Sequence, residues 1–439
     1  MLLVYTPKVT NRLGYTLGVV LRTILKVDFS ITNDRNVFDA HDDAKLCYDG
    51  SRIDGVPFIK AHHLLFETTI AEQEPRCFDY NGTKALFPVF GKDVDLPFDP
   101  FAATFYMITR YEEYLPHRED EHGRFAANES LAVAEGFLHC AVVDRWALMV
   151  ADVIHKYYPG FHIAERKFNA VLTVDIDAAY CYLHKGVLRT VTGLLRDMLH
   201  RHDMDEVKRR IRVLRHREQD PYDTFDYILD IHKRHRDMRL IFFALVADYG
   251  MFDKPISHHN IYFRQLLQHI DDYAKLGVHP SYASVERPEL VAVETKRLAD
   301  ILHRGIVRSR FHFLRLRLPD SYRSLTPAGI RHDYSMGFAE AIGLRAGTGT
   351  PYPFYDLERD YETELTIHPF CLMDTTLQKY LRMTPAEGLE AFKREVDELR
   401  EVGGTFSFIV HNQNLGELFG WKGWREVFEQ ACQYLDNQK

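Results

Sequence analysis

Short strand-like runs alternate with amphipathic helical stretches over the C-terminal two thirds of the chain, and this alternation limits the fold more than any other feature. The predicted strands are residues 170–176, 240–246, 277–279, 306–314, 365–370 and 406–411, with helical stretches such as 258–275 and 288–303 between most of them. Repeated βα units predict a parallel sheet, either a barrel or a doubly wound sheet. In both architectures reactive side chains gather at the carboxyl ends of the strands.

The chain has 439 residues, which is enough for two or three ordinary domains. Its opening predicts a strand at 1–5, a helix at 13–26 and a strand at 27–31; two further helices are predicted at 101–115 and 143–158. The last of these patterns stops at Pro159-Gly160, a pair that marks a turn. We therefore expect a smaller N-terminal α/β domain over residues 1–160 and the βα domain over residues 165–439.

Charge and hydropathy exclude several classes of partner. The net charge of −8 argues against a general nucleic-acid binder. The basic run at 208–217 is either a solvated helix face or a patch for an anionic substrate, such as a phosphorylated carrier or a nucleotide sugar. No run of about 18 apolar residues predicts a transmembrane helix. The first residues have no basic leader, apolar core or cleavage site, so a cytoplasmic location is expected. The 6 cysteines form no CxxC pair, so neither a disulfide framework nor a thiolate zinc site is indicated.

Acidic and imidazole side chains follow the predicted strands. The first strand runs into Asp175-Ile176-Asp177, the third ends at His279, the fourth contains His312, and the last ends at His411. Carboxylates and imidazoles bind divalent metals and also transfer protons, so one rim could hold an ion and keep acid and base groups available. An Asp-x-Asp pair after a strand also occurs in nucleotide-sugar glycosyltransferases and in phosphatases. Arg345 stands between these histidines in the sequence, and the order of acid pair, histidine, arginine and terminal histidine favours a metal site with acid and base groups.

This order resembles the polysaccharide deacetylase family with the NodB homology domain, over about residues 168–415. The segment 174–178 (Val-Asp-Ile-Asp-Ala) resembles the first motif, Leu344-Arg345-Ala346 the arginine motif, and the strand ending at His411 the last motif. An uncharacterised bacterial branch is similar at 279–282, 333–337 and 345–348, and its N-terminal domain has a segment similar to 109–116.

The resemblance implies a distorted (β/α) barrel that removes an acetyl or other acyl group from a sugar or glycan. It also implies one divalent metal ion, zinc or else cobalt, nickel or iron. In the family pattern Asp175 is the catalytic base, Asp177 and His279 are metal ligands, Arg345 positions the base, and His411 is the general acid.

The sequence departs from the family at the second metal histidine, because that position is Ala283. Asp177 and His279 alone would leave a catalytic metal with two protein ligands, whereas three are usual. We therefore predict that His312, on the adjacent strand, is the third ligand.

Three further residues are assigned supporting roles. Asp333 is expected to hold His411 in its charged form, and Tyr282 and Tyr352 are expected to stack against a sugar ring. Two other functions stay open from the sequence. One is a glycosyltransferase that uses Asp175 and Asp177 to hold a metal–diphosphate. The other is a non-catalytic carbohydrate-binding or assembly protein on a decayed deacetylase scaffold.

Overall fold

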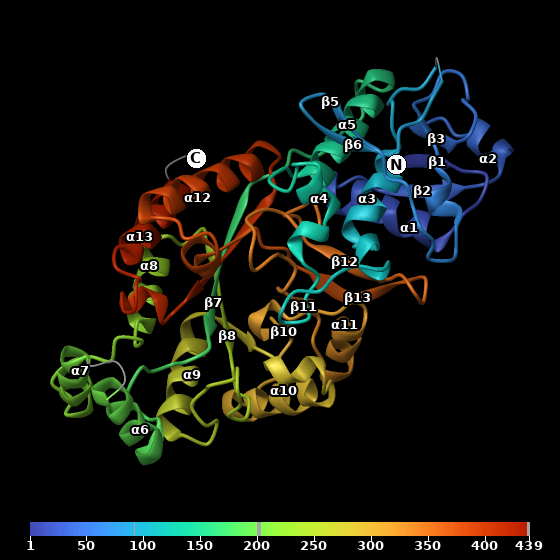
Figure 1. Cartoon of the computed structure of the whole chain (residues 1–439). Helices are drawn as coiled ribbons and strands as arrows, with labels where there is room; N and C mark the ends of the chain where they lie inside the picture. Colours follow the sequence, from blue (N-terminus) through green and yellow to red (C-terminus); the bar gives the residue numbers. More distant parts are fainter. Residues whose placement is uncertain (92, 200–202, 437–439) are drawn as a thin grey trace.

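The computed structural model describes residues 1–91, 93–199 and 203–436, and the N-terminal third lies at one end of an elongated molecule (Figure 1). Its first four strands form a parallel sheet in the order β2-β1-β3-β4. They are β1 Leu2–Tyr5, β2 Phe29–Thr32, β3 Lys45–Asp49 and β4 Phe58–Lys60. Between β1 and β2, helix α1 (Asn11–Leu17) continues into the π-helical stretch η1 (Gly18–Ile24). The predicted strand–helix–strand opening is therefore confirmed.

Helices α3 and α5 pack against each other, and both contact β6. The other N-terminal elements are α2 Arg35–Asp39, η2 His63–Phe66, the hairpin of β5 Cys77–Tyr80 and β6 Thr83–Leu86, α3 Pro100–Ile108, η3 Tyr111–Tyr114, η4 Ala127–Glu129, α4 Leu131–Ala134 and α5 Val142–Tyr157. Every residue of α3 is buried, and the carboxylate of Asp99 caps its first turn. The predicted helix at 101–115 ends earlier, at Ile108, because Arg110 takes a left-handed conformation with a φ of 54°.

The C-terminal part is built on a nine-stranded sheet in the order β12-β13-β11-β10-β9-β8-β7-β15-β14. Its strands are β7 Asn169–Ile176, β8 Arg239–Ala244, β9 Lys275–Val278, β10 Arg308–Ser309, β11 His332–Asp333, β12 Tyr352–Asp356, β13 Tyr361–Ile367, β14 Leu372–Met373 and β15 Thr405–His411. All neighbours are parallel except β12 and β13. The interior strand β7, which lies between β8 and β15, is buried apart from its first residue, as expected for a parallel strand covered on both faces.

Helices and short turns connect these strands (Figure 1). The helices are α6 Gly186–Leu199, α7 Met204–Leu214, α8 Phe225–Arg234, α9 Ile261–Tyr273, α10 Glu289–Leu302, α11 Asp320–Leu325, α12 Pro385–Glu401 and α13 Trp424–Asp436. The short turns are η5 Tyr282–Val285, η6 His312–Leu314, η7 Thr326–Ala328, η8 Thr376–Tyr380 and η9 Asn414–Gly416. Helices α6 and α7 extend from the lower-left end of the molecule in Figure 1.

All six strands predicted for this part are present, with different bounds. The largest difference is at 306–314, where β10 is only two residues long and a 3-10 turn follows. Phe313 and Leu314 have φ values of 60° and 52°, which a strand cannot accommodate. The sequence does not predict β11, β12 or β14. Two of these have only two residues, and the third pairs antiparallel with β13 instead of following a helix.

The expected distorted (β/α) barrel is not confirmed. Strands β12 and β14 are the two edges of the sheet, and no pairing joins them within the described part of the chain. The architecture is a mixed α/β fold with one large sheet.

The close approach of β9 and β10 requires glycine at position 277, because a Cβ atom there would lie 2.7 Å from the carbonyl oxygen of Arg308.

One main hydrophobic core extends through both parts of the chain, from Leu2 of β1 to Leu435 of α13. The proposed division at residues 160–165 therefore does not separate two cores, and it stays a prediction. Among the described residues, no helix combines the length and the apolar character needed to cross a bilayer.

Candidate metal centre

The carboxyl ends of β7, β9, β10 and β15 meet at one edge of the sheet. Asp175 and His411 are paired in the register of β7 and β15, and Asp177 follows immediately after β7. His279 comes directly after β9, and His312 opens the turn that follows β10. All five side chains line the same cavity. The structure thus brings together the residues that the sequence suggests as metal ligands, base and acid.

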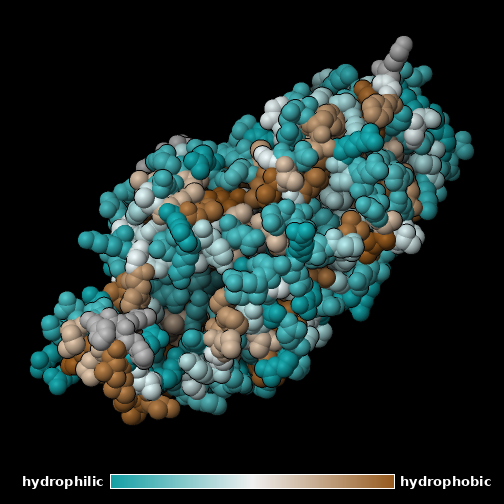
Figure 2. Space-filling model, viewed as in Figure 1, coloured by the Kyte–Doolittle hydropathy of each residue, from teal (hydrophilic) through white to brown (hydrophobic). Residues whose placement is uncertain are grey.

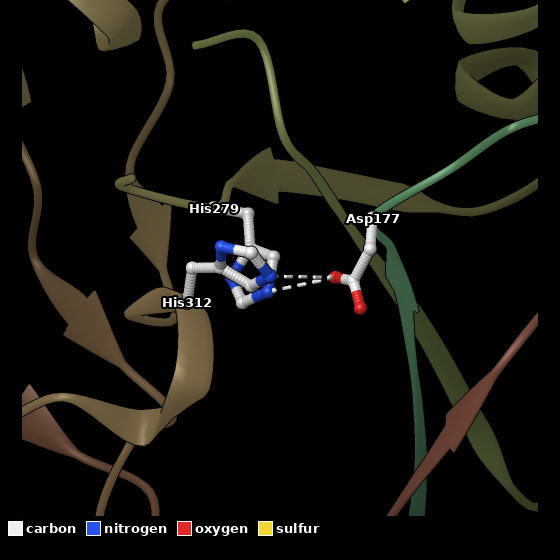
Figure 3. Close-up of side chains that lie close together, drawn as sticks. All are labelled: Asp177, His279 and His312. Carbon is white, nitrogen blue, oxygen red and sulfur yellow. Dashed lines mark ion pairs between the residues drawn. The ribbon is translucent and has the colours of Figure 1, made fainter. Parts of the chain in front are cut away.

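Asp177, His279 and His312 form a group that could hold a metal ion, and their three ligand atoms lie within 4.8 Å of one another. The Nε2 atoms of His279 and His312 are 3.3 and 3.6 Å from Oδ1 of Asp177. Figure 3 shows both imidazoles directed at this carboxylate from one side. The group combines one oxygen and two nitrogen donors, which is a common ligand set for catalytic zinc.

In each imidazole the Nδ1 atom, which is not directed at Asp177, has its own hydrogen-bond partner. Nδ1 of His312 lies 2.8 Å from Oδ1 of Asp253, and Nδ1 of His279 is hydrogen-bonded to the carbonyl oxygen of Arg310. A carbonyl oxygen only accepts, so His279 donates through Nδ1 and keeps the lone pair of Nε2 for a ligand. Outer partners of this kind orient metal-binding histidines.

The residues present fit a divalent cation. Oδ1 of Asp177 is buried and has no hydrogen-bond partner, which is unfavourable unless a cation compensates it. Metal–ligand bonds of about 2.0–2.1 Å in a tetrahedron place ligand atoms about 3.3 Å apart, close to the separations seen here. Burial alone would raise the pKa of Asp177, but His312, His279 and His411 lower it well below its usual value. Asp177 is therefore in the carboxylate form, which can bind a cation.

Arg310 positions Asp175. Its Nη1 atom lies 2.9 Å from Oδ1 of Asp175 and 2.7 Å from the hydroxyl of Thr173, while Nε donates to the carbonyl oxygen of Tyr334. The guanidinium is completely buried, with the ring of Phe243 against it. The second oxygen of Asp175, Oδ2, is 3.7 Å from Nε2 of His279 and is thus directed at the ligand group.

Arg345 does not contact Asp175 in this structure, and this corrects the sequence expectation. Its guanidinium donates to the Glu113 carboxylate over 2.6 and 2.8 Å and to the carbonyl oxygen of Gly337. Arg110 donates to the same carboxylate over 2.7 Å and to the carbonyl oxygen of Arg345. The three charged side chains are buried together. Arg345 therefore joins the N-terminal third to the large sheet.

His411 is held by Asp374, which the sequence analysis missed. Nδ1 of His411 lies 2.7 Å from Oδ1 of Asp374, and Oδ2 accepts hydrogen bonds from the His411 backbone and from Asn414. Burial alone would lower the pKa of His411, but Asp374 raises it to about 9, with smaller contributions from Asp177 and Asp175. The available signal was an acidic residue at the end of the apolar run 370–373.

Asp333, expected to charge His411, serves a different role. It lies at the end of β11, completely buried, and accepts from the hydroxyls of Ser309 and Ser335 over 2.8 and 3.0 Å. Burial raises its pKa to about 6 despite these hydrogen bonds. Asp333 thus connects β10 to the loop after β11, and Asp374 takes the role that was predicted for it.

The cavity above the ligand group has a volume of about 490 Å³. Its lining includes apolar and aromatic residues, namely Phe252, Phe313, Leu314, Ala339, Met373 and Tyr380. Its polar lining includes Glu121 and Arg124, which come from the N-terminal part, and Lys254, Lys379 and Gln413. The pattern of strand ends does not predict these residues, because all of them except Met373 lie on connecting segments, and Met373 belongs to β14, a two-residue strand that the sequence does not predict.

Neither predicted sugar-stacking tyrosine lines this cavity. Tyr352 is 1% exposed within β12, and burial raises its pKa to a value outside the usual range of tyrosine. Tyr282 lies behind the cavity wall, with its ring stacked on Phe252 at 4.2 Å and edge-on to Phe313 at 5.3 Å. The two expectations are therefore corrected, and Phe252 and Phe313 present the aromatic surface instead.

Comparisons with known proteins give a family match and several structural matches. Residues 2–159 match a family of unknown function (DUF7033). No curated protein matches the chain.

Several solved structures are distantly similar. Two are assigned as polysaccharide deacetylases, from Mycobacterium smegmatis and Pseudomonas aeruginosa PAO1; each has a TM-score of 0.39 and 14% identity, and covers 61% of this chain. The matches span 85% and 84% of those two chains. A third is a BA3943 mutant, a CE4 family pseudoenzyme with restored enzymatic activity, with a TM-score of 0.29, 8% identity, and coverage of 62% of this chain and 64% of its own. What this chain does is therefore inferred from its own side chains.

Proposed function

We propose that this chain is a metal-dependent hydrolase that removes an acetyl or related acyl group from a sugar or glycan. One observation carries the proposal. Asp175 and His411 do not belong to the ligand group, but both lie against it. Oδ2 of Asp175 is 3.7 Å from Nε2 of His279, and Nε2 of His411 is 3.7 Å from Oδ2 of Asp177. A base and an acid at one ion site are what acyl hydrolysis needs.

Asp177, His279 and His312 would hold the ion, with zinc favoured by the donor set and cobalt, nickel or iron as alternatives. When bound, a divalent cation lowers the pKa of a water molecule and polarises a carbonyl group. Asp175 would accept the proton of the attacking water at Oδ2. Because Oδ1 is tied to Arg310, the base is fixed before substrate binds, which reduces the entropy cost of reaching the reactive geometry.

His411 would donate a proton to the leaving oxygen or nitrogen of the sugar. Its Nδ1 atom is paired with Asp374, so the remaining nitrogen, Nε2, faces the ligand group. Asp374 favours the protonated imidazolium, which is the form that a general acid requires.

The size and lining of the cavity support a carbohydrate substrate. Its volume of about 490 Å³ lies within the range of about 300–1,000 Å³ that is usual for small-molecule sites. Phe252 and Phe313 can cover the apolar face of a sugar ring, while Glu121, Arg124 and Lys254 can bond its hydroxyl groups. The choice of an acetylated sugar rests on the sequence resemblance described above.

The test measures bound metal and acetate release on the same preparation, with N-acetylated and O-acetylated oligosaccharides as substrates. We expect about one metal ion per chain and acetate release that a chelator abolishes and zinc restores. Asp177→Ala should lose both metal and turnover, whereas Asp175→Asn should keep the metal and lose turnover.

His63→Ala is the matched control, because this histidine is exposed and far along the chain from the strand ends. Full metal occupancy in Asp177→Ala would refute the ligand assignment. Metal binding without acetate release from any of these substrates, or metal-dependent transfer from a nucleotide sugar, would refute the hydrolase proposal.

A further inference from the structure

Helix α6 presents an apolar face to solvent. Leu188 is 78% exposed and Leu199 60% exposed, and Val191 and Leu195 between them are also exposed. Positions 188, 191, 195 and 199 recur at helical spacing, so they share one side of α6. Figure 2 shows this row of hydrophobic residues at the lower left, over the position of α6 in Figure 1.

The only side chain of α6 that is classed as buried is polar. The carboxylate of Asp197 is completely buried, and it pairs with Arg210 of α7 at 2.5 Å. An ordinary surface helix has the opposite arrangement, with its apolar stripe against the core and its charges in water. A continuous exposed apolar face marks an interaction surface.

A cationic pocket of about 960 Å³ opens at the start of α6. It is lined by Lys185, Arg189 and Arg297 among others, and Arg297 is paired with Asp248 at 3.0 Å. Arg189 donates to the carbonyl oxygens of Lys254 and Pro255, and its guanidinium lies over the ring of Tyr249 at 4.6 Å. Within the described residues, neither Lys185 nor Arg189 has a carboxylate at ion-pair distance. The pocket therefore carries positive charge that the protein does not neutralise.

Exposed apolar and aromatic residues adjoin this pocket. Val187 and Leu188 follow the lining residue Gly186, and Ile261 and Tyr262 follow the lining residue Asn260. Tyr262 is stacked on His184, another lining residue, with a ring separation of 4.2 Å. Tyr249 lines the pocket and is 62% exposed. Aromatic and aliphatic side chains around basic groups are typical of surfaces that enter the headgroup region of a bilayer.

We propose that α6 and the cationic pocket bind the surface of a lipid bilayer that contains anionic lipids. The apolar face of α6 enters the outer edge of the acyl region, and Lys185 and Arg189 take up the phosphate of a headgroup. Charge complementarity supports this occupant. Residues 184–217 contain ten Lys and Arg against four Asp and Glu, a local net charge of +6, although the whole chain has a net charge of −8.

A second copy of the chain fits this surface less well. Two copies related by a twofold axis would bring the same patch together on both sides. Their unneutralised cations would then repel one another within a surface of low dielectric constant. An anionic bilayer covers the apolar face and neutralises the cations at the same time.

The test is co-sedimentation of the full chain with vesicles of phosphatidylcholine, alone or mixed with phosphatidylglycerol. We expect binding to the mixed vesicles, weaker binding to phosphatidylcholine alone, and loss of binding at high salt. Leu188→Glu combined with Leu195→Glu should abolish binding. Lys185→Gln combined with Arg189→Gln should weaken it by about 25-fold, since one basic residue near such a surface contributes about fivefold.

Val293→Glu is the control, because it places the same charge on a 42% exposed apolar position of α10. All the substituted leucine and valine positions are exposed, so the variants should fold normally. The proposal is overturned by absent vesicle binding, by equal binding to both vesicle types, by binding of inorganic phosphate without vesicle binding, or by a dimer that the leucine variant dissociates. Because vesicle binding is measured without turnover, these outcomes are independent of the proposed hydrolase activity.

Discussion

The Nη1 atom of Arg310 lies 2.9 Å from Oδ1 of Asp175, although the two residues are 135 positions apart in the sequence. Arg310 also precedes the proposed ligand His312 by two residues, so one short segment after β10 supplies both the group that holds the proposed base and one member of the candidate metal site. Its backbone carbonyl additionally fixes the imidazole of His279. A displacement of this segment would therefore move the base and two ligands together.

Replacing Arg310 with Lys should reduce kcat by about 100-fold, because lysine cannot bond Asp175, Thr173 and Tyr334 at once and the base loses its position. Metal content, measured by atomic emission, should stay close to one ion per chain. Arg345→Lys is the matched comparison, since it disturbs a buried arginine that contacts Glu113 and not Asp175. If Arg345→Lys lowers kcat as much as Arg310→Lys at equal folded fraction, Arg310 is not the residue that positions the base.

The buried cluster of Glu113 with Arg110 and Arg345 should contribute to stability and not to chemistry. Glu113→Gln leaves two buried guanidinium groups without their shared carboxylate, and removal of one partner of a buried pair typically costs about 3–5 kcal/mol. The free energy of unfolding by urea should fall by roughly this amount. Glu119→Gln, at a half-exposed side chain, should change it little. Unchanged stability in Glu113→Gln would show that the cluster is not a structural link between the two parts of the chain.

The strand ends could be predicted from the sequence because their signal is local. An apolar run followed by Asp175 and Asp177, or ending at His411, places these side chains at a sheet edge without knowledge of the rest of the fold. The prediction of His312 additionally needed the family pattern, because Ala283 occupies the position where that pattern has a ligand. The pairing of β7 with β15 then brings the first and last of these residues into register.

The partners of these residues could not be predicted in the same way. Arg310 lies within the predicted strand 306–314, whereas Arg345 lies in the segment that resembles the arginine motif, and only the tertiary structure decides which of them reaches Asp175. Asp374 follows the short strand β14 and Asp333 ends the short strand β11, but β14 adjoins β15, whereas β11 lies five strands away from β15 in the sheet. Strand order is a long-range property, so the sequence pattern assigned the wrong aspartate to His411. Open sheet edges and the cavity walls depend on such long-range packing as well.

Metal binding should strengthen as the pH rises. In the metal-free protein, burial alone would lower the pKa of His312, but Asp177 and Asp253 raise it to about 9. An ion must displace the proton from Nε2, so below pH 9 the apparent affinity should increase by about tenfold per pH unit. Competitive titration with a zinc indicator at several pH values measures this slope. A pH-independent affinity between neutral pH and pH 9 would contradict it.

The stability of the metal-free protein should change in the opposite direction. The folded-state pKa values of His312 and His411 are both raised, to about 9, above the ordinary histidine value of 6.5. A group whose pKa is higher in the folded state than in the unfolded state stabilises the fold. This contribution is fully present at a pH below the pKa of the unfolded state, and it is lost as the pH rises through the pKa of the folded state. Thermal unfolding of chelator-treated protein should therefore show a falling Tm between about pH 6.5 and pH 9. In the same range, the increase in Tm caused by added zinc should grow.

His411 should act as the general acid, with Asp374 as the residue that sets its pKa. His411→Ala should lower kcat by about 10²–10⁴-fold and leave the metal content intact, because His411 is outside the ligand group.

Asp374→Asn removes the charge that raises the pKa of His411, so a smaller fraction of the imidazole is protonated at a given pH. Activity that requires the imidazolium is lost as the pH rises through this pKa, and the alkaline limb of the kcat/KM profile should therefore move to lower pH in Asp374→Asn. Asp333→Asn should leave that limb in place, since Asp333 contacts Ser309 and Ser335 and not His411. An alkaline limb that moves with Asp333→Asn but not with Asp374→Asn, or undiminished turnover in His411→Ala, would show that the leaving group takes its proton from another source.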